Sequence, residues 1–212
     1  MRLQVFVGCL FVAIAISASG CGGLTAVQTW SENYALMPGT QANDPAIIDG
    51  NPQTIGQSQY IESSSDTVRG LSAGSESVVL LPEPKALHRI KIYSDNLDAF
   101  DLWVADAQGR WQKIKEVQSN KEPIIDIRLN RTTHASGVKI RVRQTSDDAE
   151  MRRQNVRRQE GYAIYSGRTR AQARIGEIEL YGFVTEGDAE NPPSDADKDA
   201  STDDELDELM NF

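Results

Sequence analysis

Apolar and polar residues alternate along several stretches in the middle of the chain. In the runs 88–93, 125–129, 138–142 and 177–181, the apolar residues fall on every second position. A period of two places successive side chains on opposite faces of a β-strand, so each run predicts a strand with one buried face. Antiparallel sheets commonly expose their other face to water. We therefore expect an antiparallel, all-β domain, with no helix of comparable length before the C-terminal segment.

Turn residues separate these predicted strands. Residues 101–104 and 111–117 flank an Ala-Gln-Gly turn at 107–109, which predicts a hairpin. A further strand at 77–81 is expected to end at Pro82-Glu83-Pro84, because proline interrupts strand pairing. Together the strands predict one β-sandwich over residues 26–184.

The segment 145–174 interrupts this rhythm. It contains seven arginines, with Tyr162 and Tyr165 between them. Connections of this length inside a compact domain are usually either functional or without fixed structure. The Arg-rich segment is therefore either a binding surface or a solvated insertion whose charge the acidic C-terminal segment balances.

The N-terminus has the pattern of an export signal. Residues 3–16 are almost entirely apolar, and small residues lead to Cys21. A run of 14 residues is short for a transmembrane helix and suits a signal segment. Ala18-Ser19-Gly20-Cys21 resembles a bacterial lipobox, so we expect a signal peptide at 1–20 and a lipidated tether at 21–25. The alternative is ordinary signal cleavage after Ser17-x-Ser19.

The cysteine content agrees with lipidation. The chain has two cysteines, and Cys9 lies within the predicted signal, so the exported chain would retain only Cys21. An internal disulfide is then impossible, and two acyl chains give stable anchoring where one would not. We expect a lipid-anchored protein of the bacterial cell envelope, at the outer membrane or facing the periplasm.

The net charge of −9 is concentrated in the C-terminal segment 185–212. This segment carries eleven acidic residues and one lysine, so the rest of the chain sums to +1. Residues 195–206 partly follow an EF-hand loop, but Ala200 replaces the glycine and Leu206 replaces the final glutamate. We therefore expect an acidic, disordered tail whose terminal apolar residues could dock on a partner.

Residues 46–54, Ala-Ile-Ile-Asp-Gly-Asn-Pro-Gln-Thr, form an oxygen-rich turn. Carboxylate, amide, hydroxyl and carbonyl oxygens at this spacing can surround a hard cation such as calcium. The same residue types also form ordinary turns, in which Asp and Asn side chains bind their own backbone.

Two motifs together resemble the discoidin, or coagulation-factor type C, domains of the galactose-binding-like superfamily. They are the 46–54 loop and the segment Gly-Glu-Ile-Glu-Leu-Tyr-Gly at 176–182. The resemblance implies a jelly-roll sandwich of about eight strands, with a structural calcium between the loop and the last strand. It would place the calcium ligands at the carbonyls of Ala46 and Gly176 and the side chains of Asp49, Asn51, Thr54 and Glu177. No His or Cys accompanies them, which argues against zinc.

Nothing in the sequence points to catalysis. His88 and His134 are the only histidines, and no nucleophile motif, phosphate loop or metal triad accompanies them. Family resemblance instead implies binding of a glycan or an anionic envelope polymer, and nucleic acid is not an expected partner. We expect the ligand site among Asp95, Asn96, Tyr162, Tyr165 and Arg168. The alternative is a structural subunit that meets an envelope protein through the Arg-rich segment and the acidic tail.

Overall fold

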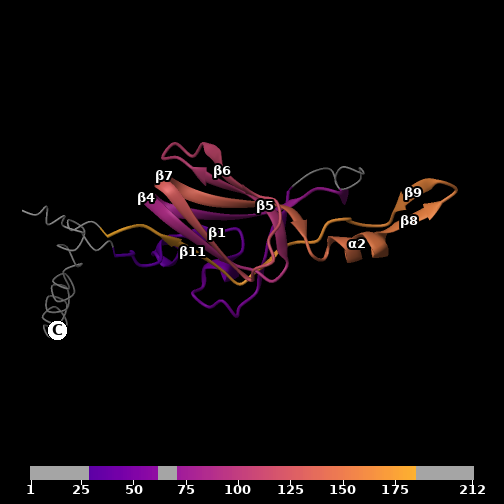
Figure 1. The fold of residues 1–212 in the computed structure, drawn as a ribbon, viewed down its shortest axis with the longest axis horizontal. Coiled ribbons are helices and arrows are strands. Elements are labelled where there is room, and N and C mark those ends of the chain that lie inside the picture. The colour runs from indigo at the N-terminus through magenta and orange to yellow at the C-terminus, as the bar shows by residue number, and fades with distance from the viewer. Residues whose placement is uncertain (1–28, 62–70, 185–212) are drawn as a thin grey trace, which may run out of the picture.

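The structure, a computed structural model, describes residues 29–61 and 71–184 (Figure 1). The predicted signal, the lipidation site Cys21, the tether up to residue 25 and the acidic tail lie outside the described residues. Within the described ranges, no helix is long and apolar enough to cross a membrane.

The described chain forms an antiparallel β-sandwich, which confirms the predicted fold class. The main sheet has the order β1-β4-β7-β5-β6, and β11 and β3 also pair with β4. Its longer strands are β4 (Ser75–Tyr93), β5 (Leu97–Ala105), β6 (Trp111–Val117), β7 (Ile124–Thr145) and β11 (Glu177–Tyr181). The shorter ones are β1 (Gln41–Ala42), β2 (Gly56–Gln57), β3 (Gln59–Tyr60), β8 (Val156–Gln159), β9 (Tyr162–Tyr165) and β10 (Arg174–Ile175).

Strands β4 and β7 are longer than the sequence predicts. The expected end at Pro82 is wrong, because β4 continues through this segment to Tyr93. The proline-containing segment instead interrupts the pairing of β4 with β7 between Leu80 and Lys85. Proline has no N–H to donate, so the pairing shifts while the strand continues. Likewise, the two alternating runs at 125–129 and 138–142 belong to the single strand β7.

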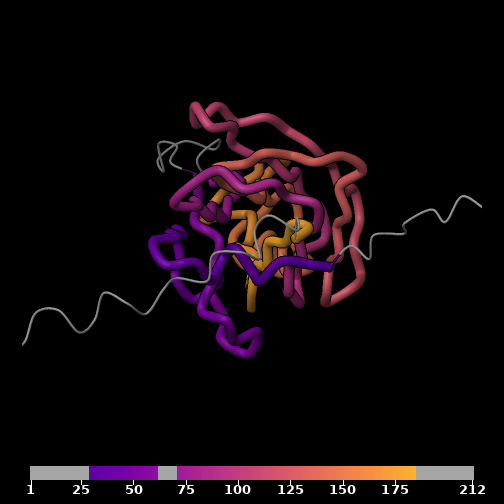
Figure 2. The backbone as a smooth tube through the Cα atoms, turned by 90° about the vertical axis from the view of Figure 1, so that its left-hand side faces the viewer, coloured from indigo at the N-terminus to yellow at the C-terminus, as the bar shows by residue number. Residues whose placement is uncertain are grey.

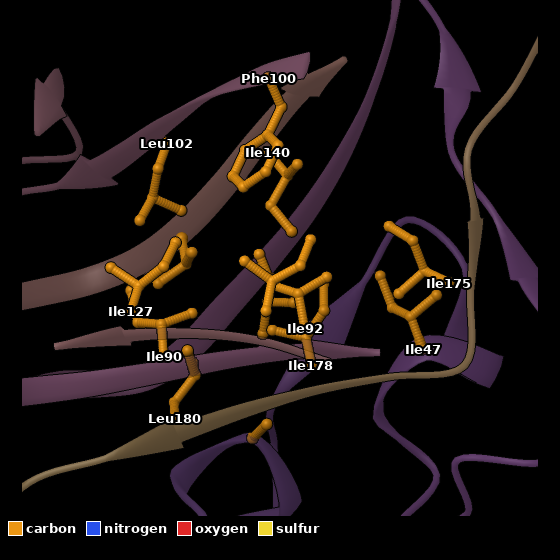
Figure 3. Close-up of a cluster of buried hydrophobic side chains, with 14 of the residues drawn as sticks. Ile47, Ile90, Ile92, Phe100, Leu102, Ile127, Ile140, Ile175, Ile178 and Leu180 are labelled. Carbon is orange, nitrogen blue, oxygen red and sulfur yellow. The ribbon is translucent and has the colours of Figure 1, made fainter. Parts of the chain in front are cut away.

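Side chains from four strands meet in the core between the layers (Figure 3). Ile90 and Ile92 of β4 are fully buried, as are Phe100 and Leu102 of β5. Burial of each such side chain favours folding by about 1.5–3 kcal/mol. The same core includes Ile127 and Ile140 of β7, Ile178 and Leu180 of β11, Ile175 of β10 and Ile47 of the 46–54 loop.

The described chain begins and ends at the same end of the sandwich. Trp30 and Phe183 form an isolated β-bridge there, and their rings stack with centroids 4.6 Å apart. Figure 2 views the molecule from this end. We call it the terminal end. The opposite end carries the β4–β5 turn and the segment that follows β7, and we call it the loop end.

The Arg-rich segment contains regular structure. Residues Asp148–Asn155 form helix α2, and β8 pairs with β9 in a hairpin beyond it. At eight residues, α2 is shorter than the long strands β4 and β7. Asp148 and Glu150 lie in the first turn, and Arg152 and Arg153 in the last, which suits the helix dipole. We call α2, β8 and β9 together the arm. It projects from the loop end (Figure 1).

Candidate functional site

The 46–54 loop begins in a short 3-10 helix, η2 (Pro45–Ile48). Asp44 caps this helix, because its carboxylate accepts hydrogen bonds from the N–H groups of Ala46, at 3.1 Å, and Gln57, at 2.7 Å. Ile47 is fully buried in the core. These contacts fix the loop to the sandwich and leave Asp49 and Asn51 on its outer side.

The loop forms several hydrogen bonds within itself. Asp49 Oδ1 accepts from the N–H of Asn51 at 2.8 Å, and Asn51 Oδ1 accepts from the N–H of Gln53 at 3.1 Å. Asn51 Nδ2 donates to Thr54 Oγ1 at 3.1 Å. This is the arrangement of an ordinary Asx turn, the alternative that the sequence left open.

Glu177, the first residue of β11, distinguishes this loop from an ordinary turn. Its side chain is 1% exposed and points toward the loop, where Oε2 accepts from the N–H of Gly50 at 3.1 Å. The other oxygen, Oε1, is buried and has no hydrogen-bond partner among the described residues. The neighbouring Gly176 allows close approach, because a Cβ there would lie 2.4 Å from the carbonyl oxygen of Pro52.

Burial raises the pKa of Glu177 to about 7, although the Gly50 N–H favours its ionised form. The nearby carboxylates of Asp49 and Glu179 raise this pKa further. Glu179 has other contacts, since its carboxylate accepts from the hydroxyls of Tyr93 and Tyr181 and lies 3.2 Å from Lys91 Nζ. Of the two glutamates in β11, only Glu177 therefore contacts the loop.

The loop and Glu177 have the composition that a hard cation requires. An unpartnered, buried carboxylate oxygen beside a second carboxylate is unfavourable unless positive charge accompanies it. Among the described residues there is no cluster of three His, Cys, Asp or Glu side chains suited to a metal. The remaining ligands would have to be neutral oxygens, as the carbonyls of Ala46 and Gly176 and the side chains of Asn51 and Thr54 provide.

The structure separates the five predicted ligand residues. Asp95 and Asn96 lie in the β4–β5 turn and line a groove of about 200 Å³, which we call the loop-end groove. Asn96 is 2% exposed, and its amide binds Asp147 Oδ2, the carbonyl of Gln172 and the N–H of Arg174. Asp95 pairs with Arg174 at 3.1 Å. Asn96 therefore holds the loop end together.

The other three predicted residues lie outside this groove. Tyr162 and Tyr165 are exposed on β9 of the arm. The Arg168 guanidinium stacks over the Tyr60 ring, 3.8 Å from its centroid. The loop-end groove consequently has no aromatic lining. A ligand role for these five residues stays a prediction.

A larger groove lies at the terminal end, and we call it the terminal groove. Its volume is about 760 Å³. Both rings and polar groups line it, with contributions from η1 (Tyr34–Leu36), the middle of β4, β7 and the segment after β11. Its lining includes Glu32, Tyr34, Lys85, His88, His134 and Phe183.

The two histidines of the chain meet in this groove because β4 pairs with β7. Ala86 lies opposite His134 in the register, and His88 is two residues further along β4. The Nε2 of His88 lies 2.9 Å from Thr132 Oγ1, while its Nδ1 is buried without a hydrogen-bond partner in the described chain. The ring of His88 packs 4.4 Å from that of Phe183.

The terminal groove was not predictable from the sequence. The two histidines are 46 positions apart in the sequence and come together only through the β4–β7 pairing, across a register shift, so no local sequence pattern could reveal the groove. The one available signal was that both histidines fall in or beside predicted strands.

Comparison with known proteins gives likeness in fold only. No known protein family matches the sequence, and no curated protein does. Among solved structures, the chain is similar to the module CpGH89CBM32-6 of Clostridium perfringens, at 16% identity and a TM-score of 0.46. That match covers 71% of this chain and 98% of the other.

Two further structures are similar to the same degree. One is chitosan-binding module 2 of a Paenibacillus chitosanase/glucanase, at 18% identity and a TM-score of 0.47, covering 71% of this chain and 100% of the module. The other is the lectin-binding domain of Lectinolysin, at 13% identity and a TM-score of 0.48, covering 71% and 96%. They were solved with chitotriose and Lewis b, respectively. These structural neighbours include family 32 carbohydrate-binding modules, which have a discoidin-like fold.

Proposed function

We propose that the chain is a non-catalytic, lipid-anchored module of the bacterial cell envelope that binds a carbohydrate in the terminal groove. A structural calcium between the 46–54 loop and Glu177 would stabilise the sandwich. The observation that carries the ligand class is the composition of the terminal groove.

Carbohydrates present apolar C–H faces and a ring of hydroxyl groups. A binding groove therefore needs aromatic surface together with hydrogen-bonding side chains. The terminal groove supplies both, with Tyr34 and Phe183 beside Glu32, Lys85 and the two histidines. Its volume of about 760 Å³ is within the usual range for small-molecule sites. The loop-end groove is polar and smaller.

Anchoring at Cys21 would place this groove near the membrane. Thr29, the first described residue, is only eight positions beyond Cys21. An extended chain covers at most about 3.6 Å per residue, so the terminal end would lie within about 29 Å of the lipid. That location favours a glycan of the envelope itself.

A glycan array tests the proposal, using residues 22–212 without the lipid. His134→Ala removes an exposed ring and a hydrogen-bonding group from the terminal groove. We expect it to weaken binding about tenfold, which corresponds to the loss of roughly 1.4 kcal/mol. Isothermal titration calorimetry with the best array ligand measures the change.

Lys121→Ala and Glu122→Ala are the matched controls, since both residues are exposed and line the loop-end groove. They should leave the affinity unchanged. Loss of binding in these controls, with none in His134→Ala, would move the site to the predicted residues at the loop end. Absence of binding to any glycan or envelope polymer would remove the proposed function.

The exposed arm favours a second candidate, a structural subunit of an envelope complex. An anchored assembly factor would retain a partner protein through the arm and the acidic tail. Co-purification from membranes with and without residues 186–212 tests it, because loss of a partner on deletion is expected only for the assembly role.

A further inference from the structure

Helix α2 is joined to the loop end, where Asp148 accepts hydrogen bonds from Thr145 Oγ1 and the N–H of Ala171, but the β8–β9 hairpin extends beyond these contacts. Among the described residues, β8 and β9 pair only with each other, and the ten residues 157–166 are all exposed. Figure 1 shows the hairpin extending away from the sandwich. An isolated two-stranded hairpin is at best marginally stable in water. The sandwich therefore does not explain why this sequence forms strands.

Apolar side chains on β9 face water. Tyr162 is 77% exposed, Ile164 48% and Tyr165 36%. They make up three of the eight large hydrophobic residues that are exposed in the described chain, all within one strand of four residues. A concentration of exposed apolar groups on a projecting element is typical of an interaction surface.

The same element carries unpaired positive charge. Arg157 lies opposite Ile164 in the hairpin, and Arg158 lies opposite Ala163. In the described part of the chain, the ion pair formed by the arm's arginines links Arg153 to Glu150 within α2, and none involves Arg157 or Arg158. Both edges of the ribbon also retain free backbone groups. The surface fits an extended peptide that carries carboxylates and apolar side chains.

The chain itself contains such a peptide. Residues 203–212, Asp-Asp-Glu-Leu-Asp-Glu-Leu-Met-Asn-Phe, include five carboxylates, four large apolar residues and no basic residue. Charge and apolar character both complement the arm.

The arm of the same molecule is a poor target for this segment. The described chain ends at the terminal end, beside Phe183, whereas the arm begins beyond Thr145 at the loop end (Figure 1). The ten residue steps of β7 from Ala135 to Thr145 alone extend about 33 Å. A flexible linker of 19 residues, which is the sequence separation between Val184 and Asp203, would span about 24 Å on average. The rigid sandwich fixes this separation, whereas two molecules can approach in any orientation.

We infer that the arm is a docking surface for the acidic, apolar segment 203–212 of a second copy of this chain. The carboxylates pair with Arg157 and Arg158, and the apolar residues cover Tyr162, Ile164 and Tyr165. The contact is heterologous, because the arm of one copy meets the C-terminal segment of the next. It therefore produces concentration-dependent chains of molecules rather than a closed symmetric dimer.

Sedimentation velocity on residues 22–212, over a wide concentration range, tests the inference. The wild-type protein should self-associate, and added salt should weaken the association because exposed ion pairs are screened. Arg157→Glu combined with Arg158→Glu should leave a monomer, as should deletion of 203–212. A fluorescent 203–212 peptide should bind the deletion variant and bind its Arg157→Glu/Arg158→Glu form at least tenfold more weakly.

Lys113→Glu with Lys115→Glu is the control, since this pair lies on β6, outside the arm, and changes the net charge equally. It should leave peptide binding intact. A wild-type chain that stays monomeric at every concentration overturns the inference. This holds even if the peptide binds, because the segment then docks on the arm of its own molecule. Equal binding of the peptide to the arm variant overturns it as well.

Discussion

The two carboxylate oxygens of Glu177 have different surroundings. Oε2 accepts a hydrogen bond from Gly50, whereas Oε1 is buried without a partner in the described chain. A buried, unpartnered polar atom disfavours the folded state by about 1–3 kcal/mol, and more when it is charged. The Asx turn around Asp49 explains the loop's own hydrogen bonds, but it leaves this oxygen unexplained. A calcium ion would satisfy both it and Asp49.

The variant Glu177→Gln tests the calcium proposal. The wild-type protein should melt about 5–10 °C higher with calcium at a hundred times its Kd than with EDTA, because binding then stabilises the fold by about 2.7 kcal/mol. The glutamine variant should lose this difference and melt at or above the wild type in EDTA, since no charge is buried. Differential scanning calorimetry measures both.

Asp49→Ala should also lose the calcium response, although it removes the Asx hydrogen bond to Asn51 too. Glu122→Gln, at the loop end, should keep the full response. A wild-type melting temperature that is indifferent to calcium and EDTA would exclude the site.

Asp147 makes the loop end sensitive to acid. Hydrogen bonding from Asn96, reinforced by Arg174, lowers the pKa of Asp147, so its ionised form is favoured in the folded state. A lowered folded pKa adds stability above the unfolded pKa of about 3.9, and this stability disappears as the pH falls through the folded pKa. Asp147→Asn should therefore destabilise by about 0.5–1 kcal/mol at pH 7, a modest figure because the site is partly exposed.

Urea unfolding at neutral and at acid pH checks this expectation. The difference between variant and wild type should shrink as Asp147 becomes protonated. Equal destabilisation at both pH values would mean that shape, rather than charge, matters at this position.

Among the secondary-structure elements, sequence periodicity predicts those that the core requires. The alternating residues of β4, β5, β7 and β11 have one face buried, so their pattern follows directly from packing. The hairpin of β5 and β6 was also predictable, because its turn contains Gly109 at a φ of +76°. Helix α2 and the β8–β9 hairpin were not predictable. Their side chains bury little surface, so their sequences show no periodic pattern of apolar residues.

The same reasoning predicts that the sandwich does not need the arm. Replacing residues 157–164 by an Asn-Gly turn should change the free energy of unfolding by less than about 0.5 kcal/mol, because exposed segments contribute little. Val156 and Tyr165 are already paired, so a short turn can join them. Urea denaturation measures the effect. Replacing core residue Phe100 by Ala should instead cost about 3–5 kcal/mol, and a comparable loss from the arm replacement would show hidden packing.

For the whole molecule, the sequence predicted that the 46–54 loop meets Glu177, but it did not predict the terminal groove. The 46–54 loop and residues 176–177 each hold their oxygen-bearing groups in a short sequence motif. The fold brings these two motifs together. The terminal groove has no motif, because its residues come from four separated segments. Asp95 and Asn96 were reasonable candidates by residue type, yet Asn96 is buried in structural hydrogen bonds. Polarity alone does not distinguish a ligand contact from a contact that shapes a turn.

Deleting residues 186–212 should separate glycan and calcium binding from self-association. The terminal groove, the 46–54 loop and Glu177 lie within the described residues, so the truncated chain should keep its proposed glycan affinity and calcium-dependent melting. Self-association should be lost, because the docking segment is gone while the arm remains. Calorimetry with the array ligand and sedimentation velocity, run on one preparation, check both expectations. If glycan binding falls together with self-association, avidity between copies explains the affinity, and the groove alone is insufficient.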